Sequence, residues 1–560
     1  MNEMELYSLW CEKAVDDPDL QTELKSIAGD SDAIKDRFYR DLEFGTGGLR
    51  GVIGAGSYRM NVYTVRRATQ GLADYVNKAF TSPSVAISYD SRIKSGVFAK
   101  EAASVLAANG IKVHIYTELM PTPMLSYAVR NLKCSAGIMI TASHNPAKYN
   151  GYKVYGSDGC QLTLDAAEIV LKNIESVPMF DGAKTISYDD GVADGRINYI
   201  PQSVIDSYLD EVSKQGIHTD LVKSSGLKVV YTPLNGTGNK PVRAILKKIG
   251  VEDVTVVPEQ EYPDGNFPTC PFPNPEIKEA LAKGLELCNV VKPDLLLATD
   301  PDCDRVGIAV PSDNGYELFT GNEVGAMLLE YICSERTKMG TMPADPVAVK
   351  TIVTTDIAAK IAKEYGVKLI EVLTGFKFIG EQIGFLEDKG QEDRYIFGFE
   401  ESYGYLAGPY VRDKDAIIGS MLICEMAAYY RSIGSSIKQR LEEIYAQYGR
   451  YLNKVDSFEF PGLTGMEKMA SIMQKLRDQP ITELAGHKVV KVTDYKKPEE
   501  TGLPAANVLI YTLENGATVV VRPSGTEPKI KTYFTTLGKD LAEAQAQKDA
   551  LAAAIEPLLK

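Results

Sequence analysis

The stretch that decides the fold is Val85-Ala86-Ile87-Ser88-Tyr89-Asp90, followed by a helical pattern up to Asn109-Gly110 and then by Ile111-Lys112-Val113-His114-Ile115. The two short runs are rich in apolar and β-branched residues, as is typical of strands. A glycine just past a helix end is the usual left-handed cap. A strand, a helix and a strand of this length form a parallel pair with a right-handed crossover, which indicates an α/β domain.

The same pattern occurs twice more along the chain. One copy begins with Leu227–Thr232 and has a helix up to Ile249-Gly250 before its second strand. The other begins with Val347–Val353 and has a helix up to Tyr365-Gly366. Three such units predict three similar α/β domains with parallel or mixed sheets.

From about Tyr451 the pattern changes to strands that flank Asn515-Gly516, the strongest short signal for a β-hairpin. This part predicts a smaller α+β domain with an antiparallel sheet. A chain of 560 residues exceeds one hydrophobic core, so several domains are expected. The predicted fold is α/β with four domains, at residues 1–205, 206–320, 321–450 and 451–560.

The composition is that of an ordinary globular protein, with 44% hydrophobic residues and a net charge of −14. This charge argues against a nucleic-acid or anionic membrane partner, because such partners need a basic face. The eight cysteines are scattered without a CxxC pair, so reduced thiols in the cytoplasm are expected. The start lacks the pattern of a signal peptide, and no uncharged apolar run of about 18 residues could span a bilayer.

The segment Thr141-Ala142-Ser143-His144-Asn145-Pro146 follows a run, Gly137–Ile140, that is typical of a buried strand. Ser143 is therefore expected at the carboxyl end of a strand, where open α/β sheets bind ligands. It is a candidate carrier of a phosphoryl group. An ordinary serine turn explains the segment by itself equally well. A hydrolase nucleophile is disfavoured because the G-x-S-x-G elbow is absent.

Three carboxylates, Asp300, Asp302 and Asp304, follow another apolar run at alternate positions. Alternate carboxylates in a tight loop can converge on one hard cation. An EF-hand is excluded, because its sixth position would be Arg305 instead of glycine and its twelfth Pro311 instead of glutamate. The alternative is a solvated acidic turn. With a cation present, Arg305 would face phosphate or hydroxyl groups of a substrate.

Three more loops carry polar groups. The segment Arg522–Lys529 could surround a phosphate with its guanidinium, hydroxyl and backbone groups, although Pro-Ser-Gly-Thr is also an ordinary turn. In Phe397–Tyr405, Glu400 and Ser402 would point the same way if the segment is extended, which suits adjacent sugar hydroxyls. A glycosidase pair is excluded there, because adjacent glutamates of an extended loop face opposite ways. The third loop, Phe44–Gly51, is glycine-rich without a Walker A ending, and it contributes Arg50.

Taken in order, these loops resemble those of the α-D-phosphohexomutase family, and within it the phosphoglucomutase branch. The matching segments are Gly45–Arg50, Thr141–Pro146 with Asn150–Lys153, Asp300–Arg305, Thr374–Lys377, Glu400–Ser402 and Arg522–Thr526. The resemblance covers essentially the whole chain. It implies four domains around a central cleft, three of them alike, and an intramolecular phosphotransferase of the isomerase class.

The resemblance also implies roles for individual residues. Ser143 would carry the phosphoryl group, and Asp300, Asp302, Asp304 and a phosphoserine oxygen would bind Mg²⁺. Arg50 and His144 would support the transferring group, with Lys153 as the general base. The residues implied to contact the substrate are Arg305, Gly375, Lys377, Glu400, Ser402, Arg522, Ser524, Gly525, Thr526 and Lys531.

The implied reaction interconverts glucose 1-phosphate and glucose 6-phosphate, with glucose 1,6-bisphosphate as intermediate and activator. Two alternatives stay open: the same mechanism on mannose or pentose phosphates, and an inactive phosphosugar-binding protein. Some relatives have a histidine where this chain has Gly404, so a second acid–base residue is not assigned. The expected partners are small sugar phosphates, without nucleic acid or membrane, for a cytoplasmic monomer or homodimer.

Overall fold

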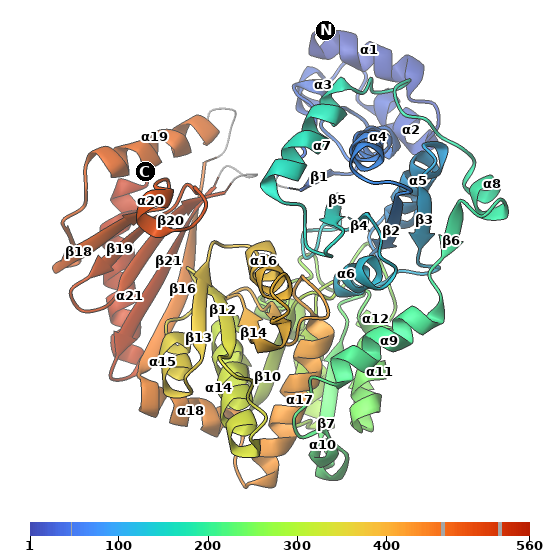
Figure 1. Cartoon of the computed structure of the whole chain (residues 1–560). Coiled ribbons are helices and arrows are strands. Elements are labelled where there is room, and N and C mark those ends of the chain that lie inside the picture. Colours follow the sequence, from blue (N-terminus) through green and yellow to red (C-terminus); the bar gives the residue numbers. More distant parts are fainter. Residues whose placement is uncertain (46, 461–464, 525–528) are drawn as a thin grey trace. The chain divides into compact units, whose positions relative to one another are not determined.

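The computed structural model describes residues 1–45, 47–460, 465–524 and 529–560. The chain folds as two compact units, both discontinuous in sequence. Unit 1 comprises residues 1–319, 380–392 and 404–432, and unit 2 comprises residues 320–379, 393–403 and 433–560. Within the described residues, the strands form four sheets, and the predicted α/β fold with a different C-terminal part is confirmed (Figure 1).

The first sheet of unit 1 has the strand order β1-β5-β4-β2-β3-β6. β2 pairs in parallel with β3 and β4, and β3 pairs in parallel with β6, whereas β5 is antiparallel to both β1 and β4. The predicted strand–helix–strand at Val85 is confirmed as β2, α5 and β3. The strand bounds are β1 (Gly48–Val52), β2 (Ser84–Tyr89), β3 (Lys112–Ile115), β4 (Ala136–Ile140), β5 (Tyr149–Gly156) and β6 (Ile197–Tyr199).

The second sheet of unit 1 has the order β11-β10-β9-β7-β8, with parallel pairs β7–β8 and β7–β9. An antiparallel hairpin, β10–β11, extends it beyond β9. The bounds are β7 (Lys228–Thr232), β8 (Asp253–Val256), β9 (Leu295–Thr299), β10 (Val306–Ser312) and β11 (Gly315–Phe319). The short strand β15 (Tyr405–Leu406) also lies in unit 1.

The helices of unit 1 include three at the N-terminus, which bury Trp10, Leu24 and Phe38 in the core of the first sheet. α5 and α6 carry successive crossovers in opposite directions along that sheet, so right-handed connections place them on opposite faces. The bounds are α1 (Glu3–Lys13), α2 (Pro18–Ser26), α3 (Ser31–Phe38), α4 (Val62–Ala79), α5 (Ser95–Ala108), α6 (Thr122–Asn131), α7 (Leu164–Ser176), α8 (Tyr188–Ala193), α9 (Gln202–Ser213), α10 (Thr219–Ser225), α11 (Asn239–Ile249), α12 (Pro258–Glu261), α13 (Ala282–Val291) and α17 (Ala416–Ser432).

In unit 2, three parallel strands have the order β13-β12-β14. Their bounds are β12 (Val347–Thr351), β13 (Lys368–Val372) and β14 (Tyr395–Phe399). The helices are α14 (Gly321–Met339), α15 (Ile357–Glu364), α18 (Ile437–Tyr448), α19 (Gly465–Asp478), α20 (Pro498–Thr501) and α21 (Leu541–Ile555). A further helix, α16 (Phe376–Glu387), begins in unit 2 and ends in unit 1.

The three α/β sheets share one core topology. In each, the first strand of the repeat lies between the second and the third, as β4-β2-β3, β9-β7-β8 and β14-β12-β13. The predicted internal repeat is therefore a true repeat of structure. Ser143, Asp300 and Glu400 each come within three residues of the end of the third strand of their repeat. The repeat thus presents a chemically different loop at the same topological position of each domain.

The C-terminal sheet of unit 2 is antiparallel, with the order β16-β21-β20-β19-β18-β17. The predicted hairpin at Asn515-Gly516 is confirmed between β19 and β20. Side chains alternate between two faces: Val519 and Val521 pack with α19 and α21, whereas Val520 packs with Ile352 and Val353. The bounds are β16 (Arg450–Glu459), β17 (Glu483–Leu484), β18 (His487–Asp494), β19 (Leu509–Leu513), β20 (Thr518–Pro523) and β21 (Lys529–Gly538).

None of the helices within the described residues combines the length and the apolar character that a membrane crossing requires.

Candidate active site

Ser143 lies in the turn between β4 and β5, with its backbone in the left-handed region at a φ of 52°. Its hydroxyl donates a hydrogen bond to Asp300 Oδ2 at 3.0 Å and lies 3.2 Å from His144 Nδ1. The Ser143 N–H donates to Thr141 Oγ1 at 2.8 Å. The predicted nucleophile and the first of the predicted metal ligands are therefore neighbours in space, although 157 positions separate them in sequence.

The turn keeps this geometry because β5 packs closely against it. The Thr141 N–H donates to the carbonyl of Gly151 at 3.1 Å. A Cβ at Gly151 would lie only 2.5 Å from the Thr141 carbonyl oxygen, so only glycine allows this approach. The side chains of β4 are all buried, which anchors the start of the turn in the core.

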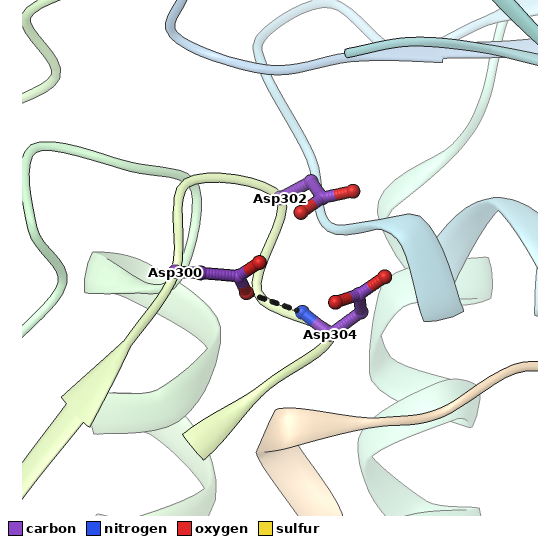
Figure 2. Close-up of side chains that lie close together, drawn as sticks. All are labelled: Asp300, Asp302 and Asp304. Atoms are coloured by element: carbon purple, nitrogen blue, oxygen red, sulfur yellow. Dashed lines mark hydrogen bonds between the residues drawn. The ribbon is translucent and has the colours of Figure 1, made fainter. Parts of the chain in front are cut away.

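Asp300, Asp302 and Asp304 come together in the loop between β9 and β10, and Figure 2 shows their side chains around one common space. Each offers a carboxylate oxygen within 4.8 Å of the others, and all three are buried. The loop is closed by Asp300 Oδ1, which accepts hydrogen bonds from the N–H groups of Asp304 and Arg305 at 3.0 Å each. The predicted convergence of the alternate carboxylates is thus confirmed in the structure.

Two ammonium groups approach these carboxylates. Lys153 Nζ lies 3.0 Å from Asp302 Oδ2, and Lys414 Nζ lies 2.9 Å from Asp304 Oδ2. Burial would raise the pKa of Asp302, but the charges of Lys153 and Lys414 outweigh burial and lower it. Burial, then the neighbouring Asp304 and Asp302, raise the pKa of Asp300 well above its usual value. The carboxyl groups of the site thus differ in pKa: that of Asp302 is lowered and that of Asp300 is raised.

The donor set fits a hard divalent cation. Asp302 Oδ1 and Asp304 Oδ1 are buried and accept no hydrogen bond from the described residues. A buried carboxylate oxygen without a hydrogen bond is costly, and an oxygen-coordinated cation removes that cost. A set of only oxygen ligands favours Mg²⁺, Ca²⁺ or Mn²⁺ over softer metals. The three aspartates can therefore hold a metal ion, and a phosphate oxygen on Ser143 would lie next to it.

Two other predicted groups of this unit, Arg305 and Arg50, place positive charge near His144. Burial, then the positive charges of Arg305 and Arg50, lower the pKa of His144 well below its usual value, so its imidazole is neutral at pH 7. Arg50 is exposed on β1, opposite Gly151 of β5. Arg305 forms an ion pair with Glu276 at 2.7 Å. Its expected contact with a substrate stays a prediction.

In unit 2, the sugar-loop candidates meet a second loop. Glu400 is buried at the end of β14, and its Oε1 accepts a hydrogen bond from the Gly375 N–H at 3.0 Å. The segment after Glu400 is not extended, because residues 401–403 form a turn and Tyr403 has a φ of 65°. Alternation therefore does not place Ser402 beside Glu400. Lys377 lies in the first turn of α16, with its ammonium 5.2 Å from the Phe378 ring centre.

The predicted phosphate loop connects β20 and β21. Arg522 and Lys531 are directly opposite each other across this antiparallel pair, so both side chains lie on one face of the sheet. Like charges at such positions destabilise a sheet, and an anion bound between them would offset that cost. The Ser524 N–H donates to the Lys529 carbonyl at 2.8 Å and closes the ends of the loop. Gly525 and Thr526 lie outside the described residues.

The chain matches sequence models of one known protein family along most of its length. Four sequence models described as phosphoglucomutase/phosphomannomutase α/β/α domains I, II and III and the C-terminal domain match residues 41–179, 206–314, 320–448 and 471–554. The chain belongs to the phosphoglucomutase/phosphomannomutase family. It is therefore a phosphohexomutase, an intramolecular phosphotransferase of the isomerase class.

Relatives of this phosphohexomutase include curated proteins from Staphylococcus aureus. A phosphoglucomutase of strain N315 is 38% identical over 556 residues, which covers 96% of this chain and 97% of the relative. Among solved structures, a Thermus thermophilus protein provisionally assigned as a phosphomannomutase has a TM-score of 0.70 at 24% identity, covering 93% and 99% of the two chains. A Paramecium phosphoglucomutase, parafusin, has a TM-score of 0.69 at 19% identity, covering 93% and 95%. The two structural likenesses concern the fold alone.

Among the described residues of this phosphohexomutase, sequence reasoning missed two whose side chains contact the aspartates of the acidic loop. Thr122, the first residue of α6, donates its N–H to the Asp302 carbonyl and its hydroxyl to Asp302 Oδ2, both at 2.9 Å. A threonine at the start of a helix is common, so no local pattern in the sequence indicated this contact.

Lys414 is the second missed residue. The residues before and after it in sequence are buried aspartates hydrogen-bonded to tyrosines. Tyr155 donates to Asp413 at 2.8 Å, and Tyr208 donates to Asp415 at 2.7 Å. The charged run at residues 412–415, directly before the apolar helix α17, was a signal that could have identified it. Charged side chains beside a buried helix are rarely left without partners, and here Lys414 forms ion pairs with Asp304 and Asp413.

Proposed function

We propose that this phosphohexomutase interconverts glucose 1-phosphate and glucose 6-phosphate through a phosphoserine at residue 143 and a glucose 1,6-bisphosphate intermediate. One observation carries the mechanism: the Ser143 hydroxyl lies 3.0 Å from Asp300 Oδ2, at the edge of three buried carboxylates that fit a cation. The choice of glucose is supported by the curated relatives, which are named phosphoglucomutase.

In the proposed first step, a free hydroxyl oxygen of the sugar phosphate forms a bond to the phosphorus of the phosphoserine. The bond between that phosphorus and Ser143 Oγ breaks, and the sugar becomes a bisphosphate. The proton of the attacking hydroxyl passes to a base, proposed to be Lys153 in its neutral amine form, which becomes an ammonium as it takes the proton. In the second step, Ser143 Oγ takes the other phosphoryl group, and the sugar oxygen that it leaves regains a proton from the Lys153 ammonium. The number of phosphoryl groups is unchanged over the cycle.

Asp300, Asp302 and Asp304, with a phosphoserine oxygen, would hold Mg²⁺. A cation there supplies charge stabilisation for the transferring group, which is the main requirement of phosphoryl transfer. Arg50 is proposed to add positive charge beside the same group. The neutral imidazole of His144, 3.2 Å from Ser143 Oγ, can exchange a hydrogen bond with the serine oxygen as it gains and loses the phosphoryl group.

The loops of unit 2 are proposed to recognise the substrate. Glu400 and Ser402 would bind sugar hydroxyls, with Gly375 and Lys377 beside them. The non-reacting phosphate would bind the positive loop after β20, and Arg305 of unit 1 is a further proposed substrate contact. The residues proposed for this phosphate are Arg522, Ser524, Gly525, Thr526 and Lys531. Support comes from the hydrogen bond that joins Gly375 to Glu400 and from the facing pair Arg522 and Lys531.

The proposal includes the domain boundaries 1–205, 206–320, 321–450 and 451–560. They are supported by the four family matches, which fall within these ranges to within one residue. A monomer or homodimer with small sugar phosphates as its partners is proposed. A cytoplasmic location is also proposed, supported by eight cysteines that are thiols and not disulfides.

The test is a coupled assay of the purified protein with glucose 1-phosphate, Mg²⁺ and a trace of glucose 1,6-bisphosphate. We expect turnover, and we expect Ser143→Ala to lower kcat by about 10³-fold or more because the phosphoryl carrier is lost. Binding of glucose 6-phosphate to this variant should stay measurable by calorimetry. Intact-mass analysis of the active wild type should find one added phosphate on Ser143.

Ser88→Ala is the matched control, because Ser88 is a buried serine of β2 whose hydroxyl donates to the Met120 carbonyl at 2.9 Å. It should keep full turnover per folded molecule. If kcat/KM is higher on mannose or pentose phosphates than on glucose 1-phosphate, the substrate assignment changes and the mechanism stands. Binding of sugar phosphates without turnover on any of them would favour the inactive binding protein. Unchanged turnover in Ser143→Ala would refute the phosphoserine mechanism.

A further inference from the structure

The turn that carries Ser143 is held from behind by one buried arginine. Arg92 Nη1 donates to the carbonyls of Pro146 and Tyr149 at 3.0 and 3.1 Å. Its Nη2 donates to the carbonyls of Ser143 and Asn145. One guanidinium therefore binds four backbone carbonyls of the segment from Ser143 to Tyr149, and its side chain is fully buried.

The orientation of Arg92 is itself determined by its surroundings. Its Nε lies 3.3 Å from Asp90 Oδ2, and its guanidinium carbon lies 5.1 Å from the centre of the Phe267 ring. Asp90 is also fully buried, and it accepts the hydroxyls of Thr141 at 2.6 Å and Ser95 at 2.7 Å. Asp90 thus connects Arg92 to the residue two positions before Ser143. The Arg92 side chain thus has few alternative orientations, because Asp90 contacts its Nε, its guanidinium lies over the Phe267 ring and both Nη atoms are hydrogen-bonded.

Arginine suits this position for a geometric reason. Its planar fork presents several N–H groups in fixed directions, whereas lysine offers one compact ammonium that cannot reach four carbonyls together. The left-handed φ of 52° at Ser143 costs free energy for a residue with a Cβ, so the turn needs external support. In a planar peptide the C=O and the N–H point in opposite directions. Holding the Ser143 carbonyl therefore also turns the His144 N–H away from Arg92.

We propose that Arg92 is a positioning residue for phosphoryl transfer, which sets the direction of the Ser143 side chain by binding the carbonyls of its turn. The inference rests on the proposed function, because it assumes that Ser143 carries the phosphoryl group. Arg92 acts through the turn and does not need to touch the sugar phosphate. Its loss should therefore change the chemical step more than substrate binding.

The test compares Arg92→Lys with Arg59→Lys. Arg59 is a matched control because it is also a buried arginine that forms an ion pair with Asp36 and donates to backbone carbonyls, those of Asp36 and Tyr58. We expect Arg92→Lys to lower kcat by about 100-fold, the effect of misplacing a reacting group by about 1 Å. KM should change less than about threefold, since the proposed substrate contacts are unchanged. Arg59→Lys should keep kcat.

A phosphorus NMR spectrum of the phosphoenzyme gives a readout that a structural role alone would not move. The phosphoserine resonance should shift in Arg92→Lys and keep its wild-type position in Arg59→Lys, while both variants lose similar thermal stability. If Arg92→Lys does not fold, Asp90→Asn is measured in the same way, because it removes the charge that orients the guanidinium. A kcat within twofold of wild type together with an unshifted resonance, in the folded variant, would refute the role of Arg92.

The two proposals fail in different ways. A wild-type protein that is active without phosphate on Ser143 would refute the proposed function and this inference together. A wild type that is phosphorylated on Ser143, with an Arg92 variant indistinguishable from it, would refute only the inference. Equal losses of kcat in Arg92→Lys and Arg59→Lys would assign both arginines a general structural role and would also refute it.

Discussion

The contact between Thr122 and Asp302 allows a specific prediction for the substitution Thr122→Val. The Thr122 hydroxyl donates to Asp302 Oδ2 at 2.9 Å, while its N–H holds the Asp302 carbonyl at the same distance. Valine has nearly the shape of threonine, so the change removes the hydroxyl bond and keeps the backbone bond. Thr122 is fully buried, so water cannot easily replace the lost donor.

The magnitude follows from the type of bond. A hydrogen bond to a charged group contributes about 1.5–3 kcal/mol, and about 1.4 kcal/mol corresponds to a tenfold change in an equilibrium constant. If the bond orients Asp302 for the cation, Mg²⁺ affinity should fall by about 10- to 100-fold. The same range is typical of residues that orient metal ligands without touching the metal.

The assay is calorimetric titration of the EDTA-treated protein with MgCl₂, together with activity as a function of Mg²⁺ concentration. Thr122→Ser keeps the hydroxyl and should bind Mg²⁺ within about threefold of wild type. Thr69→Val is the control for losing a buried threonine hydroxyl elsewhere, because Thr69 Oγ1 donates to the Val65 carbonyl of its own helix at 2.7 Å. An Mg²⁺ affinity of Thr122→Val equal to that of Thr122→Ser would show that this bond does not orient a metal ligand.

Two more predictions concern charged groups. Lys414→Met should strengthen Mg²⁺ binding measured by titration, because it removes a positive charge 2.9 Å from Asp304. The same variant should destabilise the EDTA-treated protein by about 3–5 kcal/mol in urea unfolding, because it leaves the buried charge of Asp304 without this partner. Weaker Mg²⁺ binding would contradict the assignment of Asp304 as a ligand. Burial would raise the pKa of Asp494, but hydrogen bonds from Arg477 outweigh burial and lower it below the usual value. The contribution of the Asp494 carboxylate to the free energy of unfolding should therefore be present above about pH 4 and lost as the pH falls further. Asp494→Asn should therefore flatten the acid side of the curve of unfolding free energy against pH, and an unchanged slope would contradict the pKa assignment.

Features that depend on a short segment of the chain, such as a strand or a capped helix, could be predicted from the sequence. The strand at Val85 and its two repeats were recognisable because a buried strand and a capped helix each have a local residue pattern. The same local patterns placed Ser143 and Asp300 after strands. In an open parallel sheet, strand ends are where ligands bind, so the candidate residues could be named before their partners were known.

Features that depend on two distant segments were predicted less well. Alternation would make Glu400 and Ser402 point the same way only in an extended segment, but the chain turns after β14 and Glu400 accepts the Gly375 N–H. The strand β21 was not expected, although it pairs with β16 over ten positions. Which strands pair depends on side-chain packing across the sheet, and the sequence of one strand alone does not determine that packing.

By itself, the sequence determined the kind of chemistry: a hydroxyl nucleophile, three alternate carboxylates, cationic loops and a repeated α/β unit. Residue types and local periodicity carry that information, because they act over a few positions along the chain. Only the tertiary structure decided that Ser143 meets Asp300, that Thr122 and Lys414 support the acidic loop, and that Arg92 binds the turn of Ser143. These contacts arise where crossovers and packed domains bring strand ends together, and their free energy depends on burial, which exists only in the folded chain.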